Sequence, residues 1–126
     1  MLKYFFLVVA IVWTGLILFV CLIKSSSVPT VNIVGIDKVV HFAMHLTFTF
    51  LWGMAFLKGS FFPKVSGALI AAFLLSLCFG LLIEGAQAFF TSTRSADSTD
   101  VLANFLGSLL ALAILNSSSK TNENNK

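Results

Sequence analysis

Charged residues are scarce in this sequence. Of its 126 residues, 10% are Asp, Glu, Lys or Arg and 58% are hydrophobic, and the mean hydropathy is +0.98. A soluble domain has about 25% charged and about 45–50% apolar residues. This composition therefore excludes a soluble domain and predicts an integral membrane protein. The net charge is only +3. We therefore expect no nucleic-acid partner.

Cysteine is almost as rare. Cys21 and Cys78 lie in separate apolar runs and form no CxxC motif. The sequence therefore gives no support for a redox centre or a cysteine-bound metal. We expect both cysteines to behave as small apolar residues, and we expect no metal and no cofactor.

Long apolar runs make up most of the chain. About twenty apolar residues in a helix match the roughly 30 Å hydrocarbon core of a bilayer. The sequence predicts four such helices, at about residues 4–23, 39–57, 65–90 and 101–115. The expected fold is thus an all-α, integral membrane four-helix bundle. It forms one domain over residues 1–116, and residues 117–126 are expected to be a disordered polar tail.

The basic residues predict the orientation of the bundle, because cytoplasmic flanks carry an excess of Lys and Arg. With the N-terminus inside, the cytoplasmic side receives Lys3, Lys58, Lys64, Lys120 and Lys126, and the outer side receives Lys24, Lys38 and Arg94. The prediction is a multi-pass membrane protein with N-in/C-in orientation.

The polar residues of the apolar part converge on one end of this bundle. Because the spans alternate in direction, the start of the second helix, the end of the third and the start of the fourth lie on the same side of the membrane. Residues four apart share a helix face, as do residues three apart. The sequence therefore predicts an outward-facing polar pocket lined by Asp37, Lys38, His41, His45, Glu84, Gln87, Arg94, Asp97, Asp100 and Asn104. Ser98 or Thr99 is the expected N-cap of the fourth helix.

Small residues line one face of the fourth helix. Ala103, Gly107 and Ala111 follow a spacing of four residues. Membrane helices approach one another closely at such positions. We expect the fourth helix to pack tightly there, at the depth of the polar residues.

The polar motifs resemble those of the VanZ-like membrane protein family. The matching residues fall within 37–115 and read "DKVVHF", "EGAQAF" and "RSADSTDVLANFLG". The resemblance implies a small, multi-span bacterial membrane protein of the cell envelope. The family's founding member is associated with resistance to the glycopeptide teicoplanin, and the resemblance implies no particular reaction.

Several functions fit the predicted pocket. The first is a site that binds an anionic lipid headgroup or an amphiphile such as a lipoglycopeptide, with membrane lipids as partners. Its ligand-binding residues would be Asp37, Lys38, Gln87, Arg94, Asp97, Asp100 and Asn104. The second is a hydrolase or transferase for a lipid-linked or cell-wall-related substrate, with His41 and Glu84 as acid and base.

Three further alternatives stay open. A divalent metal could be held by His41 or His45 with carboxylates from Glu84, Asp97 or Asp100. The charges could also form a structural clamp, in which Asp37 pairs with Arg94, Glu84 pairs with Lys38 or His41, and Asp100 caps the fourth helix. Conduction of ions would require an oligomer, because the polar groups of one unit gather at one end and leave no continuous polar path across the apolar remainder.

Overall fold

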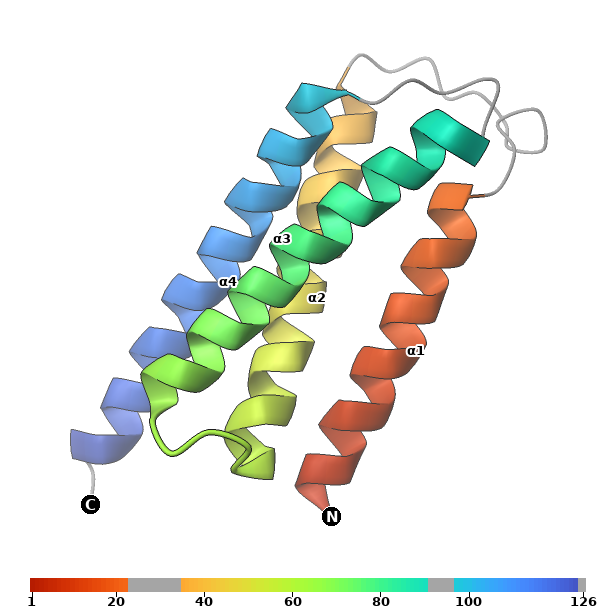
Figure 1. Cartoon of the computed structure of the whole chain (residues 1–126). Coiled ribbons are helices and arrows are strands. Elements are labelled where there is room, and N and C mark those ends of the chain that lie inside the picture. Colours follow the sequence, from red (N-terminus) through yellow and green to blue (C-terminus); the bar gives the residue numbers. More distant parts are fainter. Residues whose placement is uncertain (23–34, 91–96, 125–126) are drawn as a thin grey trace.

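The structure is a computed structural model that describes residues 1–22, 35–90 and 97–124. Its elements over these ranges are four helices: α1 (Leu2–Leu22), α2 (Ile36–Gly59), α3 (Val65–Phe90) and α4 (Ser98–Asn124). Each helix is long and apolar enough to cross a membrane. The helices run alternately up and down, and both termini lie at the same end (Figure 1). The predicted four-helix membrane bundle is confirmed, and the protein is a multi-pass membrane protein.

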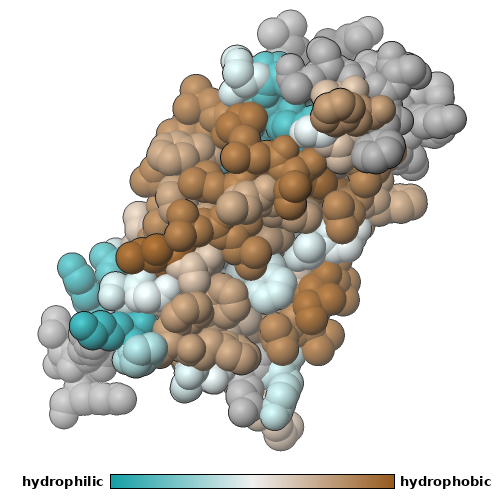
Figure 2. Space-filling model, viewed as in Figure 1, coloured by the Kyte–Doolittle hydropathy of each residue, from teal (hydrophilic) through white to brown (hydrophobic). Residues whose placement is uncertain are grey.

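The outer surface of the bundle is apolar over most of its length. Hydrophobic residues cover the middle of the face shown in Figure 2, and hydrophilic groups gather toward the two ends. Large side chains such as Phe19, Leu82 and Phe89 are exposed. In water such a surface would drive aggregation, whereas in a bilayer it faces lipid chains of the same polarity.

The helices α2 and α4 make the most extensive contact in the bundle. Ala103, Gly107 and Ala111 are all buried on α4, as the spacing predicted. A Cβ atom added at Gly107 would overlap the carbonyl oxygen of Phe42 and lie 3.1 Å from the amide nitrogen of Leu46. The two backbones are therefore as close here as glycine allows.

Two tryptophans attach α1 to α2. The indole Nε1 of Trp13 donates to the carbonyl oxygen of Met44 (3.1 Å), and that of Trp52 donates to Oγ1 of Thr14 (3.1 Å). Further along α1, Ile17 and Cys21 form an apolar core with Phe48 and Ile83. Cys21 is thus a buried apolar residue, and Cys78 is exposed on α3.

The fourth helix is longer than the sequence predicted. The expected span of 101–115 lies inside a helix that runs from Ser98 to Asn124, so the predicted disorder of the tail is wrong over residues 117–124. Hydroxyl groups in this segment donate to carbonyl oxygens four residues earlier, as from Ser117 to Ala113 and from Thr121 to Ser117. These bonds satisfy the polar side chains within the helix itself. Residues 125–126 of the predicted tail lie outside the described ranges.

The close approach of α2 and α4 predicts a large effect of one methyl group. Gly107→Ala should destabilise the protein by about 1–3 kcal/mol, because overpacking forces the two backbones apart. Gly15→Ala is the matched control, since a Cβ atom there meets nothing within 4 Å. Thermal unfolding in detergent compares the two variants. Equal midpoints would contradict the proposed tight contact at Gly107.

Candidate functional site

A cluster of polar side chains lies at the end of the bundle opposite the termini. The start of α2, the end of α3 and the start of α4 meet there (Figure 1). We call it the polar cluster, and it consists of Asp37, Lys38, His41, Glu84, Asp97, Asp100 and Asn104. All seven residues were expected at one end from the alternating directions of the spans. The structure adds which of them touch.

Lys38 is the centre of the ion pairs in the polar cluster. Its Nζ atom lies 2.6 Å from Oδ2 of Asp97, 2.6 Å from Oδ1 of Asp100 and 3.4 Å from Oδ2 of Asp37. Two of these carboxylates come from α4 or the residue before it, and the lysine comes from α2. Lys38 therefore joins the beginnings of two helices, and its charge is already compensated by neighbouring carboxylates.

Asp97 caps the N-terminus of α4. Its Oδ1 accepts hydrogen bonds from the amide of Thr99 (2.9 Å) and from the Thr99 hydroxyl (2.7 Å). Its carbonyl oxygen accepts from the amides of Asp100 and Val101. These are the bonds of an N-cap residue. The predicted N-caps are therefore wrong. They were Ser98 or Thr99, or alternatively Asp100, and they lie one to three positions after Asp97.

His41 is enclosed by polar groups from three helices. Its Nδ1 lies 3.1 Å from Oδ1 of Asn104 and 3.9 Å from Oε1 of Glu84. Its Nε2 lies 3.6 Å from Oδ2 of Asp100 and 3.9 Å from Oδ1 of Asp37. The ring is 4% exposed. Both ring nitrogens of His41 therefore face polar groups, which come from α2, α3 and α4.

Three buried atoms of the polar cluster form no hydrogen bond among the described residues, and one of them, Oδ1 of Asp100, is ion-paired with Lys38. The other two are Oε1 of Glu84 and Nδ2 of Asn104, and both residues are at most 4% exposed. The other oxygen of Glu84, Oε2, accepts from the amide of Asp97 (3.2 Å). A buried polar atom left unpaired costs about 1–3 kcal/mol. One acceptor and one donor are therefore available at the inner side of the cluster.

A crevice between α3 and α4 leads from the lipid-facing surface to Asn104. It has a volume of about 210 Å³ and is lined by Leu77, Gly80, Leu81, Val101, Asn104 and Phe105. We call it the α3–α4 crevice. At its rim Leu81 and Phe105 are exposed, whereas Gly80 and Asn104 are buried at its base. An apolar passage thus reaches the edge of the polar cluster from the side.

His45 belongs to a second set of polar contacts, deeper in the bundle. Its Nδ1 lies 2.8 Å from Oγ of Ser76, which in turn lies 2.8 Å from Oγ of Ser108. Both serines are fully buried. His45, which was predicted to line the pocket, therefore lies deeper than the polar cluster, and its contact with Ser76 was not predicted. As an isolated hydroxyl within the apolar run of α3, Ser76 was a detectable sign of a buried contact.

The remaining predicted ligand-binding residues are Gln87 and Arg94. Gln87 uses its Nε2 to donate to the carbonyl oxygen of Cys21 (3.0 Å), so it connects α3 to α1. Arg94 lies outside the described residues, as do Lys24 and Lys126. The suggested pairing of Asp37 with Arg94 therefore remains a prediction, whereas the pairing of Asp37 with Lys38 is observed.

Asp37, His41 and Asp100 bring three potential metal-ligand atoms within 4.8 Å of one another. Carboxylate oxygen and imidazole nitrogen are suitable ligands for zinc. However, the ammonium group of Lys38 already contacts Asp100 and would repel a divalent cation at this position. The geometry therefore favours an ion-paired cluster over a metal centre.

The ion pair between Lys38 and Asp97 predicts a pH-dependent stability. Lys38 and, to a smaller extent, the bonds from Thr99 hold the pKa of Asp97 well below its usual range. A lowered pKa stabilises the folded state above the unfolded pKa of about 3.9, and this contribution is lost as the pH falls toward the folded value.

We therefore expect Asp97→Asn to lower the unfolding midpoint at pH 7 and to have progressively less effect below about pH 4. The asparagine oxygen can still cap α4, so the substitution removes the charge and keeps the cap. Unfolding of both proteins in detergent across this pH range measures the difference. A difference that stayed constant with pH would show that charge is not its cause.

The comparison with known families agrees with the motifs in the polar cluster. No curated protein and no solved structure matches the chain. The family model described as VanZ/LLP1 matches residues 4–118. The match covers all four helices, including α1, which the motifs themselves do not reach. The chain therefore belongs to the VanZ/LLP1 family.

Proposed function

We propose that this protein binds the headgroup of an anionic lipid or a related amphiphile at the polar cluster. In the orientation predicted by the lysine distribution, the cluster faces the outer leaflet of a bacterial cytoplasmic membrane. The association of the founding VanZ member with resistance to teicoplanin, a lipophilic glycopeptide, is consistent with such a ligand. The proposal places the protein in the cell envelope as a binding protein.

The observation that carries this proposal is the unpaired state of Glu84 Oε1 and Asn104 Nδ2. A cluster that served only as a clamp would be expected to satisfy its own buried atoms. Lys38 and Asp97 pair with each other within the cluster. Glu84, in contrast, offers an unpaired acceptor, and Asn104 offers an unpaired donor, both beside His41. A headgroup that carries both hydroxyl groups and charged oxygens can satisfy both atoms.

The α3–α4 crevice supports an amphiphilic ligand over a water-soluble one. Its walls are apolar apart from Asn104, and its rim lies on the lipid-facing surface. A ligand held in the bilayer can place a chain in this crevice and its polar group next to Asn104. In the proposal, Arg94 on the connection between α3 and α4 supplies the positive charge, because Lys38 is already paired.

An envelope hydrolase or transferase is the second candidate. It is favoured by His41 and Glu84, two buried side chains 3.9 Å apart of the types that serve as general acid and base. Catalysis through a serine would need a nucleophile beside a base. Ser76 has the right distance from His45, 2.8 Å, but no exposed surface. Among the described residues this serine is therefore out of reach of a ligand, and binding without turnover fits better.

Filling the crevice tests the proposed binding site. We expect Val101→Phe to remove co-purified lipid or amphiphile, since Val101 lines the crevice. Leu102→Phe is the matched control, because Leu102 is the next residue on α4 and its side chain is exposed outside the crevice. Native mass spectrometry of both variants, purified in mild detergent, measures the retained ligand. Equal retention in the two variants would overturn the crevice as the route.

The polar cluster is tested by the phenotype that the protein confers on cells. Glu84→Ala, Arg94→Ala and Asp100→Ala should each abolish it, because they remove proposed ligand contacts or an ion pair of the cluster. Lys58→Ala and Lys64→Ala should leave it intact, because both lysines are exposed at the other end. Membrane abundance must be equal. If the two groups then behaved alike, the cluster would not be the functional site.

A further inference from the structure

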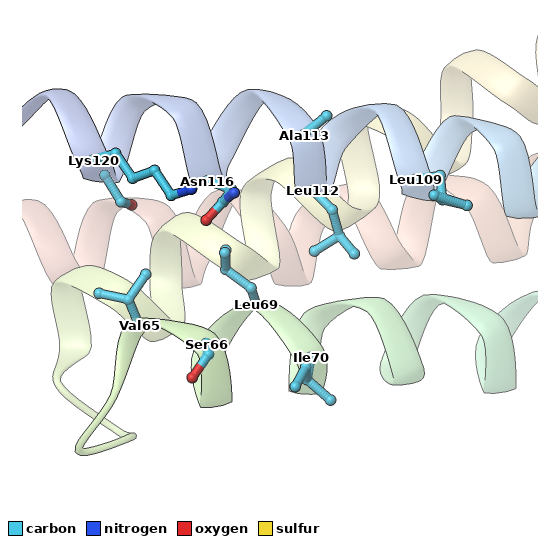
Figure 3. A pocket seen from close by; sticks show the side chains of 10 residues that line it. Val65, Ser66, Leu69, Ile70, Leu109, Leu112, Ala113, Asn116 and Lys120 are labelled. Atoms are coloured by element: carbon cyan, nitrogen blue, oxygen red, sulfur yellow. The ribbon is translucent and has the colours of Figure 1, made fainter.

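A second hollow lies far from the polar cluster, between the beginning of α3 and the last turns of α4. It has a volume of about 490 Å³. Figure 3 shows its lining residues: Leu69, Ile70, Leu109 and Leu112 form the apolar part, and Ser66, Asn116 and Lys120 lie toward one end. We call it the terminal groove. It exists because α3 and α4 contact each other less extensively than α2 and α4.

Polarity changes in one direction along the terminal groove. The apolar part lies toward the middle of the bundle, and the polar part lies near the C-terminal end of α4 (Figure 3). The side chain of Lys120 extends toward that of Asn116 in the same view. An ammonium and an amide are thus placed together at the polar end of the terminal groove. The order of apolar and polar groups along the groove matches that of a phospholipid, whose chain is apolar and whose phosphate is polar.

Charge at this end of the bundle is positive. Lys58, Lys64 and Lys120 are exposed here. The four acidic side chains that the structure describes, those of Asp37, Glu84, Asp97 and Asp100, belong to the polar cluster at the opposite end. Lys120 therefore has no neighbouring carboxylate among the described side chains, in contrast to Lys38. Its ammonium group is available for an anion from the bilayer.

We propose that the terminal groove binds one acyl chain of an anionic phospholipid, with the lipid phosphate held by Lys120 and Asn116. The lipid belongs to the leaflet that faces the two termini. By the predicted orientation this is the cytoplasmic leaflet, where anionic lipids attract basic residues. The site shares no residue with the polar cluster or the α3–α4 crevice, so it does not depend on the ligand proposed there.

Competition between two lipids tests this site. The purified protein is mixed with equal amounts of phosphatidylglycerol and phosphatidylcholine in detergent, and native mass spectrometry counts the adducts. We expect the wild type to prefer phosphatidylglycerol, and Lys120→Gln to reduce this preference by about fivefold, the factor that corresponds to one lysine at a membrane surface. Lys64→Gln is the matched control, because it removes the same charge at the same end but lies outside the groove.

A second pair of variants tests the apolar part of the groove. Leu112→Trp should remove the one lipid bound in the groove, of either kind, because the indole fills the groove, whereas Ile114→Trp should keep it, because Ile114 is exposed and outside the groove. An equal loss of preference in Lys120→Gln and Lys64→Gln would overturn the site in favour of diffuse charge attraction. Unchanged adducts in Leu112→Trp would overturn the groove. Val101→Phe should leave these adducts intact, which separates this site from the α3–α4 crevice.

Discussion

The ion pairs of Lys38 are the interaction on which the polar end of this protein depends. A membrane protein must satisfy its buried charges internally, since lipid chains offer no partners. The ammonium group of Lys38 meets this need for the buried carboxylate of Asp100, also contacts the exposed carboxylates of Asp37 and Asp97, and joins α2 to the start of α4. Below it, Gly107 lets the same two helices approach until their backbones touch. His41 and Asn104 are brought within hydrogen-bond distance between these two contacts.

Structural and functional roles are divided among the polar residues. Asp97 pairs with Lys38 and caps α4, and Gln87 bonds to the backbone of α1, so both contribute to the fold. Glu84 and Asn104 keep one unpaired atom each. If the proposed ligand binds at these two atoms, the same cluster serves both as a clamp between helices and as a binding site.

The two proposed lipid sites differ in the way they present charge. At the polar cluster, Lys38 is neutralised by carboxylates, and selectivity comes from hydrogen bonds to Glu84, His41 and Asn104. At the terminal groove, Lys120 is exposed beside the apolar part of the groove, and the proposed selectivity comes from its charge. The first site suits a ligand with a complex polar head, and the second suits an ordinary anionic phospholipid.

The sequence by itself determined the membrane class, the four spans, the close packing at Gly107 and the gathering of polar residues at one end. These features follow from hydropathy over twenty residues and from helical spacing, which are local properties. The tertiary structure decided that Lys38 binds Asp97 and Asp100, that Asp97 caps α4, that Gln87 turns to α1, and that a crevice reaches Asn104. Such pairings depend on how each helix is rotated and how closely it packs. That is set by contacts between residues up to 66 positions apart.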